Sequence, residues 1–263
     1  MMKSVVICLG FMVSCLNIYS QEHSRLSLGQ QPVYKVFPAG EKIVIDGKKD
    51  EMIWRKAEAR EFNNHYREEK PTDRQKSTFR MVRDAQYLYV FFEFEDQFLT
   101  ARETNPDSEP YLDDCAEIFI IPAPDSMDSH IGFELNIYKA SNDFIYFNDY
   151  YQDKDYVLKG FDPEFKASVT YSGTLNDNSD LDRGWTLELA IPFDNFRNLP
   201  NQLFPGDQVK WAFQAVRQDR NEVEGSRIST STLFPIYDIS KGVHQVNRFG
   251  LMEFLDNNSK NEN

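Results

Sequence analysis

Two runs of alternating residues, separated by a polar turn, most restrict what this chain can fold into. The first run spans residues 115–121 (CAEIFII) and the second spans residues 132–138 (GFELNIY). Side chains alternate between the two faces of a β-strand, so alternation of this kind is typical of strands and not of helices. In the second run Phe133, Leu135 and Ile137 share one face, which predicts a strand with an apolar side and a polar side.

The polar positions of these two strands form a candidate functional face. Glu117 is the one acid in an otherwise apolar strand, and Glu134 and Asn136 share the polar side of the other strand with Tyr138. Carboxylates and amides side by side on a sheet can hydrogen-bond sugar hydroxyls or exchange protons with a substrate. We therefore predict that this face is a sugar-binding or acid–base surface.

Short strands bounded by turn residues also make up most of the remaining chain. Two helical segments are expected, a short helix in residues 51–57 (EMIWRKA) and a turn or helix after Pro192. Many short strands with few helices favour an all-β fold, an antiparallel β-sandwich of the jelly-roll kind with one or two short helices. Residues 61–73 are expected to form a polar loop, and further strands are expected at residues 34–37, 42–45, 77–83, 87–95, 165–171, 185–191, 208–217 and 248–254.

The first 20 residues have the pattern of a secretory signal peptide. Lys3 precedes the apolar run VVICLGFMV, which is too short to span a bilayer but is typical of a cleaved signal. We expect export, to the periplasm, the cell surface or the medium, with cleavage near Ser20–Gln21. The alternative is lipoprotein processing, which would leave a lipid anchor at Cys15. The mature chain is then expected to have a flexible lead-in over residues 21–33, one sandwich domain over residues 34–255 and a disordered tail over residues 256–263.

Charge and cysteine content exclude several classes of partner and bond. The formal net charge is −13, and a chain this acidic repels phosphate backbones, so we expect no nucleic-acid partner. Removal of the signal would leave Cys115 as the only cysteine, which excludes an internal disulfide bond. Beyond the signal, no apolar run is long enough for a transmembrane helix. Neutral glycans are compatible with the charge, and the aromatic content of 14% suits stacking on sugar rings.

Seven sequence blocks, in the same order, resemble those of family 9 carbohydrate-binding modules and their relatives. IDGKKDEMIWRKA is similar to the family's opening pattern IDG-x-x-D-E-x-x-W-x-x-A, and YLYVFFEFED is similar to its next block. LDDCAEIFI resembles the D-D-x-x-E-x-F strand, and FELNIYKAS resembles the strand that contains Asn. GWTLELAIPF, VKWAFQAVRQDR and HQVNRFGLMEF resemble the last three blocks, with Gln214 where Asn is usual. Together the blocks span residues 43–254.

The resemblance implies a β-sandwich that binds glycans and often accompanies a catalytic domain in an enzyme that degrades polysaccharides. In well-known members two tryptophans clamp a terminal sugar, but Trp54, Trp185 and Trp211 of this chain occupy motif positions that indicate structural roles. Stacking on the ligand is therefore expected from tyrosines. The candidates are Tyr111, Tyr138, Tyr150 and Tyr151.

Residues at the family's matching positions are expected to contact the ligand. Among them, Arg217 either binds two sugar hydroxyls with its guanidinium group or pairs with Glu117 in a structural ion pair. The full set of predicted ligand-binding residues is Tyr111, Asp114, Glu117, Glu134, Asn136, Tyr138 and Arg217.

No cofactor is required for this function, but a structural calcium ion is expected. The resemblance implies calcium in structural loops, and the segment NDNSDLDRG carries oxygen-bearing side chains at alternate positions from Asn176 to Asp182. Such a set suits a hard cation, although a plain hairpin turn is the alternative. The predicted metal ligands are Asp113, Asp180 and Asp182, with Asp114 as a further candidate.

Two functions are compatible with these residues. The first is a glycan-binding module of polysaccharide catabolism with no chemistry of its own. The alternative is a glycoside hydrolase, or a subunit that works with one, in which Glu117 and Glu134 form the carboxylate pair that hydrolysis requires. The blocks of the binding module occupy nearly all of the expected mature chain, which leaves no room for a conventional hydrolase domain and favours the first function.

Overall fold

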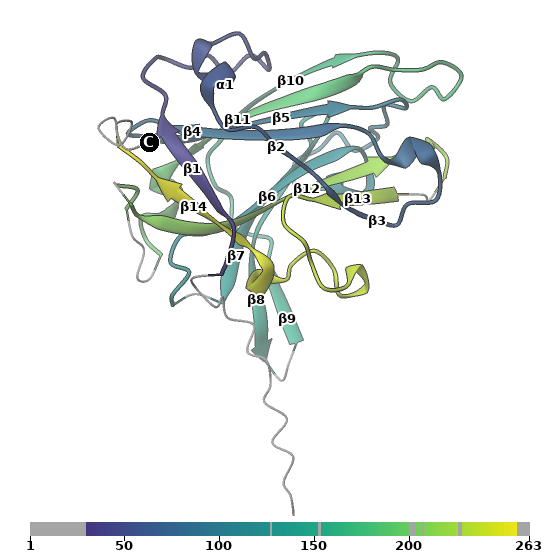
Figure 1. Ribbon diagram of the computed structural model, residues 1–263. Helices are drawn as coiled ribbons and strands as arrows, with labels where there is room; N and C mark the ends of the chain where they lie inside the picture. Colours follow the sequence, from purple (N-terminus) through teal and green to yellow (C-terminus); the bar gives the residue numbers. More distant parts are fainter. Residues whose placement is uncertain are drawn as a thin grey trace, which may run out of the picture.

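Two β-sheets face each other across an apolar core, and strand β1 pairs with both of them (Figure 1). The computed structural model describes residues 30–126, 128–151, 154–199, 204–206, 208–225 and 228–256, without the side chains of residues 149–151. The expected signal peptide with Cys15, most of the lead-in, the side chains of Tyr150 and Tyr151, and the tail beyond Asp256 therefore lie outside the described residues.

We name the two layers sheet A and sheet B. Sheet A contains β14, β12, β6, β7, β8 and β9, with β13 beside β12 and β3 beside β13, and sheet B contains β10, β11, β5, β4 and β2. The described strands are β1 (Val33–Pro38), β2 (Arg60–Glu61), β3 (Asn64–Tyr66), β4 (Ser77–Arg83), β5 (Tyr87–Glu95), β6 (Cys115–Ile121), β7 (Ser129–Asn136), β8 (Ser141–Tyr151), β9 (Lys154–Leu158), β10 (Lys166–Ser172), β11 (Gly184–Pro192), β12 (Lys210–Arg220), β13 (Ile228–Thr232) and β14 (Gly250–Phe254). The described helical segments are α1 (Met52–Lys56) and the 3₁₀ turns η1 (Pro71–Asp73), η2 (Pro110–Leu112), η3 (Phe193–Phe196), η4 (Ile239–Lys241) and η5 (Val246–Arg248).

Neighbouring strands are antiparallel, as expected for a sandwich, except where β1 takes part. β1 runs parallel to β14 in sheet A and parallel to β4 in sheet B. The long strand β12 pairs with β6 along one edge, and with β14 and then β13 along the other. The predicted β-sandwich with few helices is therefore confirmed, with β1 as a parallel link between its layers.

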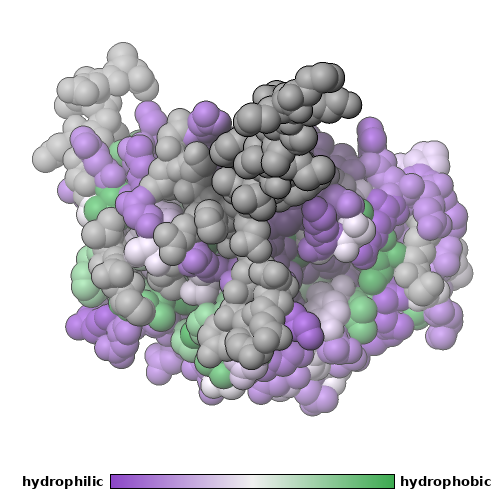
Figure 2. Space-filling model, turned by 90° about the horizontal axis from the view of Figure 1, so that it is seen from below, coloured by the Kyte–Doolittle hydropathy of each residue, from purple (hydrophilic) through white to green (hydrophobic). Residues whose placement is uncertain are grey.

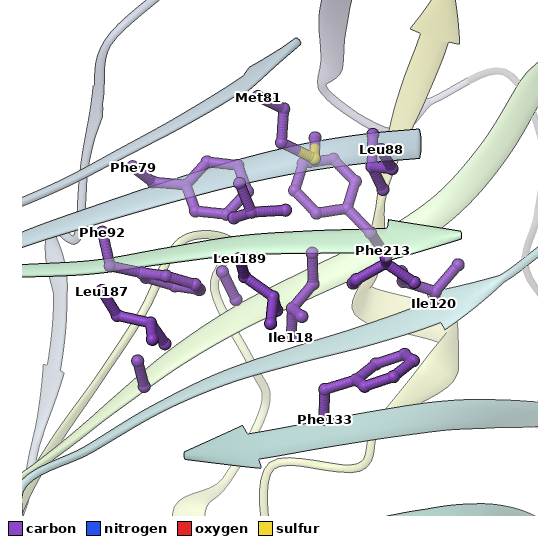
Figure 3. Close-up of a cluster of buried hydrophobic side chains, with 14 of the residues drawn as sticks. Phe79, Met81, Leu88, Phe92, Ile118, Ile120, Phe133, Leu187, Leu189 and Phe213 are labelled. Carbon is purple, nitrogen blue, oxygen red and sulfur yellow. The ribbon is translucent and has the colours of Figure 1, made fainter. Parts of the chain in front are cut away.

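The core comes from one face of each strand. Ile118 of β6 and Phe133 of β7 point into it from sheet A, and Phe92 of β5 and Leu187 of β11 point into it from sheet B (Figure 3). Each of these side chains is at most 1% exposed. Full burial of a side chain of this size stabilises the fold by about 1.5–3 kcal/mol, so the alternating apolar positions determine which face of each strand turns inward.

Several strand boundaries match those expected from the alternation. β4, β5 and β6 have the expected bounds. β7 ends at Asn136, before the expected end at residue 138, because the chain turns there. Oδ1 of Asn136 accepts a hydrogen bond from the backbone N of Ala140 (2.9 Å), and Lys139 between them has a φ of 63°.

Expectations about the outer segments were less accurate. Residues 42–45 are not a strand in the described chain, because Ile43 packs beside Trp54 in a segment that covers sheet B. The expected polar loop over residues 61–73 contains short strands, β2 in part and β3. The sequence ISTST of β13 was not expected to be a strand, because it lacks an apolar face.

The face of the molecule seen in Figure 2 is mostly polar where its residues are described. Seen from below, most of it is hydrophilic, with hydrophobic residues scattered in small groups (Figure 2). Among the described residues, none of the helices combines the length and the apolar character that a membrane crossing requires.

Candidate binding pocket

The outer face of sheet A carries two acidic side chains directly opposite each other. Glu117 on β6 pairs in register with Glu134 on β7, because both alternate with residues that face the core. The row extends to neighbouring strands, since Asn142 of β8 lies opposite Glu134 and Gln218 of β12 contacts Glu117. Glu117 and Glu134 thus lie on one polar face, as the alternation predicts.

Each of these carboxyl groups accepts a hydrogen bond from a neighbouring amide. Nε2 of Gln218 donates to Oε1 of Glu117 (3.0 Å), and Nδ2 of Asn142 donates to Oε2 of Glu134 (2.7 Å). The hydroxyl of Thr230 donates to Oε1 of Gln218 (2.7 Å) and so fixes the orientation of that amide. Oε2 of Glu117 is buried and has no hydrogen-bond partner among the described residues. A buried polar atom without a hydrogen-bond partner destabilises the fold. A ligand hydroxyl that donates to Oε2 of Glu117 would remove this penalty.

Burial changes the protonation of both acids. It raises the pKa of Glu117 to about 7. It also raises the pKa of Glu134 well above its ordinary value, and the charge of nearby Glu117 adds to this shift. Like charges at short range oppose each other's ionisation, so the pair retains a proton to higher pH than isolated glutamates do. A pair in this state can both donate and accept hydrogen bonds.

A cavity of about 310 Å³ lies over this row of side chains. One wall is formed by the chain between Ile239 and His244, which crosses the outer face of sheet A. The volume falls within the range of small-ligand pockets, about 300–1,000 Å³. The lining residues are Arg67, Tyr111, Glu117, Glu134, Asn142, Phe144, Tyr146, Val157, Lys159, Gln218, Thr230, Ile239, Gly242, Val243 and His244.

Stacked aromatic rings form a neutral part of the pocket wall. Tyr146 stacks on His244 with ring centroids 4.2 Å apart, and His130 stacks on His244 at 5.1 Å. Nε2 of His130 and Nδ1 of His244 are 3.0 Å apart. Burial lowers the pKa of His244 to about 4 and the pKa of His130 well below its ordinary value, so both rings are neutral at pH 7. The pocket thus combines an apolar ring surface with polar groups.

The rim of the pocket is formed by exposed or partly exposed side chains. Tyr111 lies in η2 and is partly exposed, and its hydroxyl donates to Oε1 of Glu109 (2.6 Å). Arg67 and Lys159 are exposed cations on the rim. Tyr138, the other described tyrosine predicted to stack on a ligand, is 43% exposed in the turn after β7 and is not among the described lining residues.

Asn136 lies on the polar face of β7, but its amide already has structural partners. Its Nδ2 donates to the backbone O of Glu103 (2.8 Å) and to Oδ2 of Asp113 (3.0 Å). Its Oδ1 accepts from the backbone N of Ala140, as described above. Asn136 therefore ties the turn after β7 to the loop before η2, next to the pocket.

Arg217 does not lie on this face, so the expectation that it shares a surface with Glu117 was wrong. Alternation along β12 places Gln218 outward and turns Arg217 towards sheet B. Its Nη2 lies 3.0 Å from Oδ2 of Asp96 and 3.0 Å from Oδ2 of Asp219, and its Nη1 donates to Oγ of Ser77 (2.7 Å). The predicted alternative, an ion pair between Arg217 and Glu117, was therefore also wrong, and Arg217 pairs with these two aspartates instead.

Three buried carboxylates gather beside Arg217. Asp96, Asp114 and Asp219 each place one oxygen within 4.8 Å of the others. Burial raises the pKa of Asp219 to about 7 and that of Asp114 well above its ordinary value. Oδ1 of Asp219 and Oε1 of Gln75 are buried without a hydrogen-bond partner among the described residues. All-oxygen donors of this kind fit Ca²⁺, and Arg217 supplies one positive charge to the same group.

The carboxylates predicted to bind calcium lie in loops that they hold in place. Asp113 pairs with Arg102 (3.2 Å) and also accepts from its backbone N (2.8 Å). Asp182 accepts from the backbone N of Thr174 (2.7 Å), and Asp180 accepts from its hydroxyl (3.1 Å). Calcium binding by these three aspartates stays a prediction.

Several pocket residues were not identified from the sequence. Gln218 and Thr230 could have been found, because each follows the alternation of a strand next to β6 or β12. His244 and the chain before it have no such signal, since this wall is a loop with the single turn η4. Its position depends on contacts far along the chain, such as the ring stack with Tyr146.

A family model and solved structures are similar to this chain. The model for the carbohydrate family 9 binding domain-like family matches residues 45–254. No match was found among curated proteins. A family 9 carbohydrate-binding module from Caldicellulosiruptor kristjanssonii, solved with cellotriose, is 18% identical with a TM-score of 0.57, over 88% of this chain and 97% of that chain.

Two further solved structures are similar to this chain over most of its length. The structure of a Caldicellulosiruptor kristjanssonii family 9 module with glucose is 18% identical with a TM-score of 0.55, over 87% of this chain and 99% of that chain. A protein from Bacteroides uniformis is 14% identical with a TM-score of 0.61, over 85% of this chain and 99% of that chain. At these identities the similarity to solved structures shows a shared fold.

Proposed function

Because the chain belongs to the carbohydrate family 9 binding domain-like family, we propose that it binds a poly- or oligosaccharide and has no chemistry of its own. The proposed site is the pocket over Glu117 and Glu134. The modules with the same fold that were solved with cellotriose and glucose support a neutral sugar as the class of ligand.

The paired acids are the observation that carries this proposal. A sugar hydroxyl both donates and accepts hydrogen bonds, and a carboxyl pair that holds one proton matches both capacities. Oε2 of Glu117 has no hydrogen-bond partner among the described residues, while Gln218 holds the other oxygen in place. A sugar hydroxyl in the cavity would donate a hydrogen bond to this oxygen, and leaving a buried polar atom without a partner costs about 1–3 kcal/mol.

Aromatic stacking is a second part of the proposal. Tyr111 stands at the rim with part of its ring exposed, and the stacked rings of Tyr146 and His244 line the pocket. Sugar rings have apolar C–H faces that pack on aromatic rings, while their hydroxyls project to the sides. We therefore assign Tyr111 the stacking role and the acids the role of hydroxyl recognition.

A hydrolase is the second candidate function, and the raised pKa values of the two acids favour it. A glycosidase needs one protonated and one ionised carboxyl at the scissile bond, which this pair supplies near neutral pH. Against it, Glu117 and Glu134 are only 1% and 4% exposed, and each accepts from an amide. Both facts limit access of the acids to a glycosidic oxygen, so we prefer the binding function.

One experiment separates these functions. The purified chain would be applied to an array of plant and microbial glycans, and each bound glycan would then be incubated with it and assayed for reducing ends. We expect binding without hydrolysis. Hydrolysis that is lost in Glu117→Gln or Glu134→Gln would replace the binding function with the enzyme.

We also propose that the protein is exported and acts in polysaccharide catabolism. The signal-like pattern of residues 1–20 supports export, and lipidation at Cys15 is the alternative form of processing. N-terminal sequencing of the protein from its native host distinguishes a start near Gln21 from a blocked, acylated Cys15. An intact Met1 would refute export by either route.

A further inference from the structure

The outer face of sheet B is covered over only part of the length of its strands. On the covered part, Trp54 of the α1 segment packs on Phe91 and Ala190. The other part is open and holds a cavity of about 490 Å³, larger than the pocket over Glu117. This groove faces away from sheet A, so it is separate from the proposed sugar site.

The turn at Gly47 fixes one wall of the groove. The backbone N of Gly47 donates to Oε2 of Glu188 (3.0 Å), and the hydroxyl of Thr186 donates to the carbonyl O of Gly47 (2.7 Å). Gly47 has a φ of +80°, and a Cβ there would lie 3.0 Å from Cγ2 of Thr170, so a larger residue would be strained. The turn therefore lies rigidly against β10 and β11 and positions the next side chains over the groove.

The floor of the groove is a row of polar side chains across four strands. Thr78 of β4, Glu93 of β5, Thr186 of β11 and Thr170 of β10 lie opposite one another in register. In the next row Gly184 presents no side chain, which deepens the floor. A Cβ at Gly184 would lie 1.9 Å from the carbonyl O of Phe94, so this position requires glycine.

Positive charge surrounds this floor although the protein as a whole is strongly acidic. The lining contains the four cations Lys49, Lys76, Arg80 and Arg183 against the two acids Glu93 and Glu95, whereas the whole chain has a net charge of −13. An excess of one sign of charge in a cleft concentrates ligands of the opposite sign.

The four cations have different roles. Nζ of Lys49 lies 2.5 Å from Oε2 of Glu93, and Nη1 of Arg80 lies 3.3 Å from the same oxygen, so these two are already paired. The side chain of Lys76 is 60% exposed, and its Nζ lies 4.0 Å from Oε1 of Glu61, farther than in the two pairs with Glu93. The side chain of Arg183 is exposed. Lys76 and Arg183 are therefore the cations that an anionic ligand would meet.

We propose that this groove is a second binding site, for an acidic oligosaccharide. The carboxylate or sulfate of the sugar would pair with Lys76 and Arg183. Its hydroxyls would bond to the threonine hydroxyls and to Glu93, which would repel a bare inorganic anion but accepts hydrogen bonds from a sugar. The two signs of charge in the groove thus match a ligand that carries both an anion and hydroxyl donors.

The test is titration calorimetry of the full chain with oligogalacturonate, a heparin-derived oligosaccharide and poly-L-glutamate. We expect one of the two saccharides to bind, with an affinity that falls as salt is added, and the one that binds identifies the charged group as carboxylate or sulfate. In Lys76→Gln/Arg183→Gln this affinity should fall about tenfold, since charge-assisted hydrogen bonds are the strong ones. The matched control is Arg55→Gln/Lys56→Gln, which removes two exposed cations of α1 outside the groove and should bind as the wild type does.

Three results would overturn the proposal. They are a failure of both saccharides to bind, equal binding by the groove variant and the α1 variant, and binding of poly-L-glutamate as tight as that of the saccharide. An excess of a neutral oligosaccharide that occupies the first pocket should leave this binding unchanged, so failure of the groove and failure of the Glu117 pocket are measured separately.

Discussion

Glu117 and Glu134 lie opposite each other on β6 and β7 with both carboxyl groups buried on the outer face of sheet A. Each carboxyl group accepts one amide hydrogen bond, and burial raises the pKa of both acids. The pH dependence of stability follows from this arrangement.

The first prediction concerns the pH dependence of stability. The pKa of Glu117 is raised from 4.5 to about 7 in the folded state, so the folded chain holds this proton more tightly than the unfolded chain. The contribution of the bound proton on Glu117 to the free energy of unfolding is fully present below about pH 4.5. It is lost as the pH rises through about 7. Glu117→Gln should therefore reduce the fall in the free energy of unfolding between pH 5 and pH 7, by up to about 1.4 kcal/mol per pH unit.

Urea unfolding at several pH values measures this effect. Glu69→Gln changes an exposed glutamate and is the control, whose pH profile should match that of the wild type. Identical slopes for wild type and Glu117→Gln would show that Glu117 ionises normally in the folded chain.

The second prediction concerns stacking in the pocket. Tyr111→Ala should weaken glycan binding about two- to tenfold, because aromatic packing is worth about 0.5–1.5 kcal/mol. The fold should be unaffected, since Tyr111 is partly exposed in a short turn. Calorimetry with the best glycan from the array gives the affinity. Tyr156→Ala is the matched control, because Val157 and not Tyr156 lines the pocket on β9.

The third prediction assigns Asn136 to the turn after β7. Asn136→Ala should lower the free energy of unfolding by about 1–3 kcal/mol, because it leaves the carbonyl of Glu103 and the amide of Ala140 without their partner. Its glycan affinity should stay close to that of the wild type at a temperature where the variant is folded. A large loss of affinity with unchanged stability would instead support the direct ligand contact predicted from the sequence.

The fourth prediction concerns the buried ion pairs of Arg217. Arg217→Met should destabilise the fold by about 3–5 kcal/mol, since it leaves Asp96 and Asp219 without their cation. Arg197→Met removes an exposed pair with Asp194 and should cost less than about 1 kcal/mol. Denaturant unfolding compares the two variants, and equal effects would contradict the structural role of Arg217.

The fifth prediction concerns calcium. If Asp96, Asp114 and Asp219 bind Ca²⁺ in the native state, added calcium should raise the melting temperature of the wild type by mass action, and EDTA should reverse the increase. Asp219→Asn should respond less to calcium than Asp194→Asn, which changes an exposed aspartate outside both candidate calcium sites. Melting curves of the wild type that are the same with calcium and with EDTA would exclude a native-state ion.

The fold could be predicted largely because alternation reports directly on burial. β6 has the expected bounds, and the inward positions of Ile118 and Phe133 follow from the same pattern. The placement of Arg217 was available from this rule too, since Trp211, Phe213 and Ala215 before it on β12 all face the core. The resemblance to the family motif suggested that Arg217 contacts a ligand, whereas the alternation along β12 indicates that Arg217 is buried.

The remaining parts of the site depend on long-range contacts that no local pattern encodes. The stack of Tyr146 on His244 joins β8 to a segment almost a hundred residues later, and that segment has no strand or helix period. The groove on sheet B likewise exists because the segment around Trp54 covers only part of the sheet. Neither property can be read from spacing along the chain.

The parallel pairing of β1 has a mechanical consequence. Residues Val33–Val36 pair along β14, and Phe37 and Pro38 pair with β4, so the first strand of the sandwich is bonded to both layers (Figure 1). A pull on the chain before Val33, directed along β1, loads these hydrogen bonds in shear and all at once. Bonds loaded together share the force, whereas bonds at the end of a hairpin open one after another. A tether that holds this domain from its N-terminal side would therefore load hydrogen bonds to both sheets together.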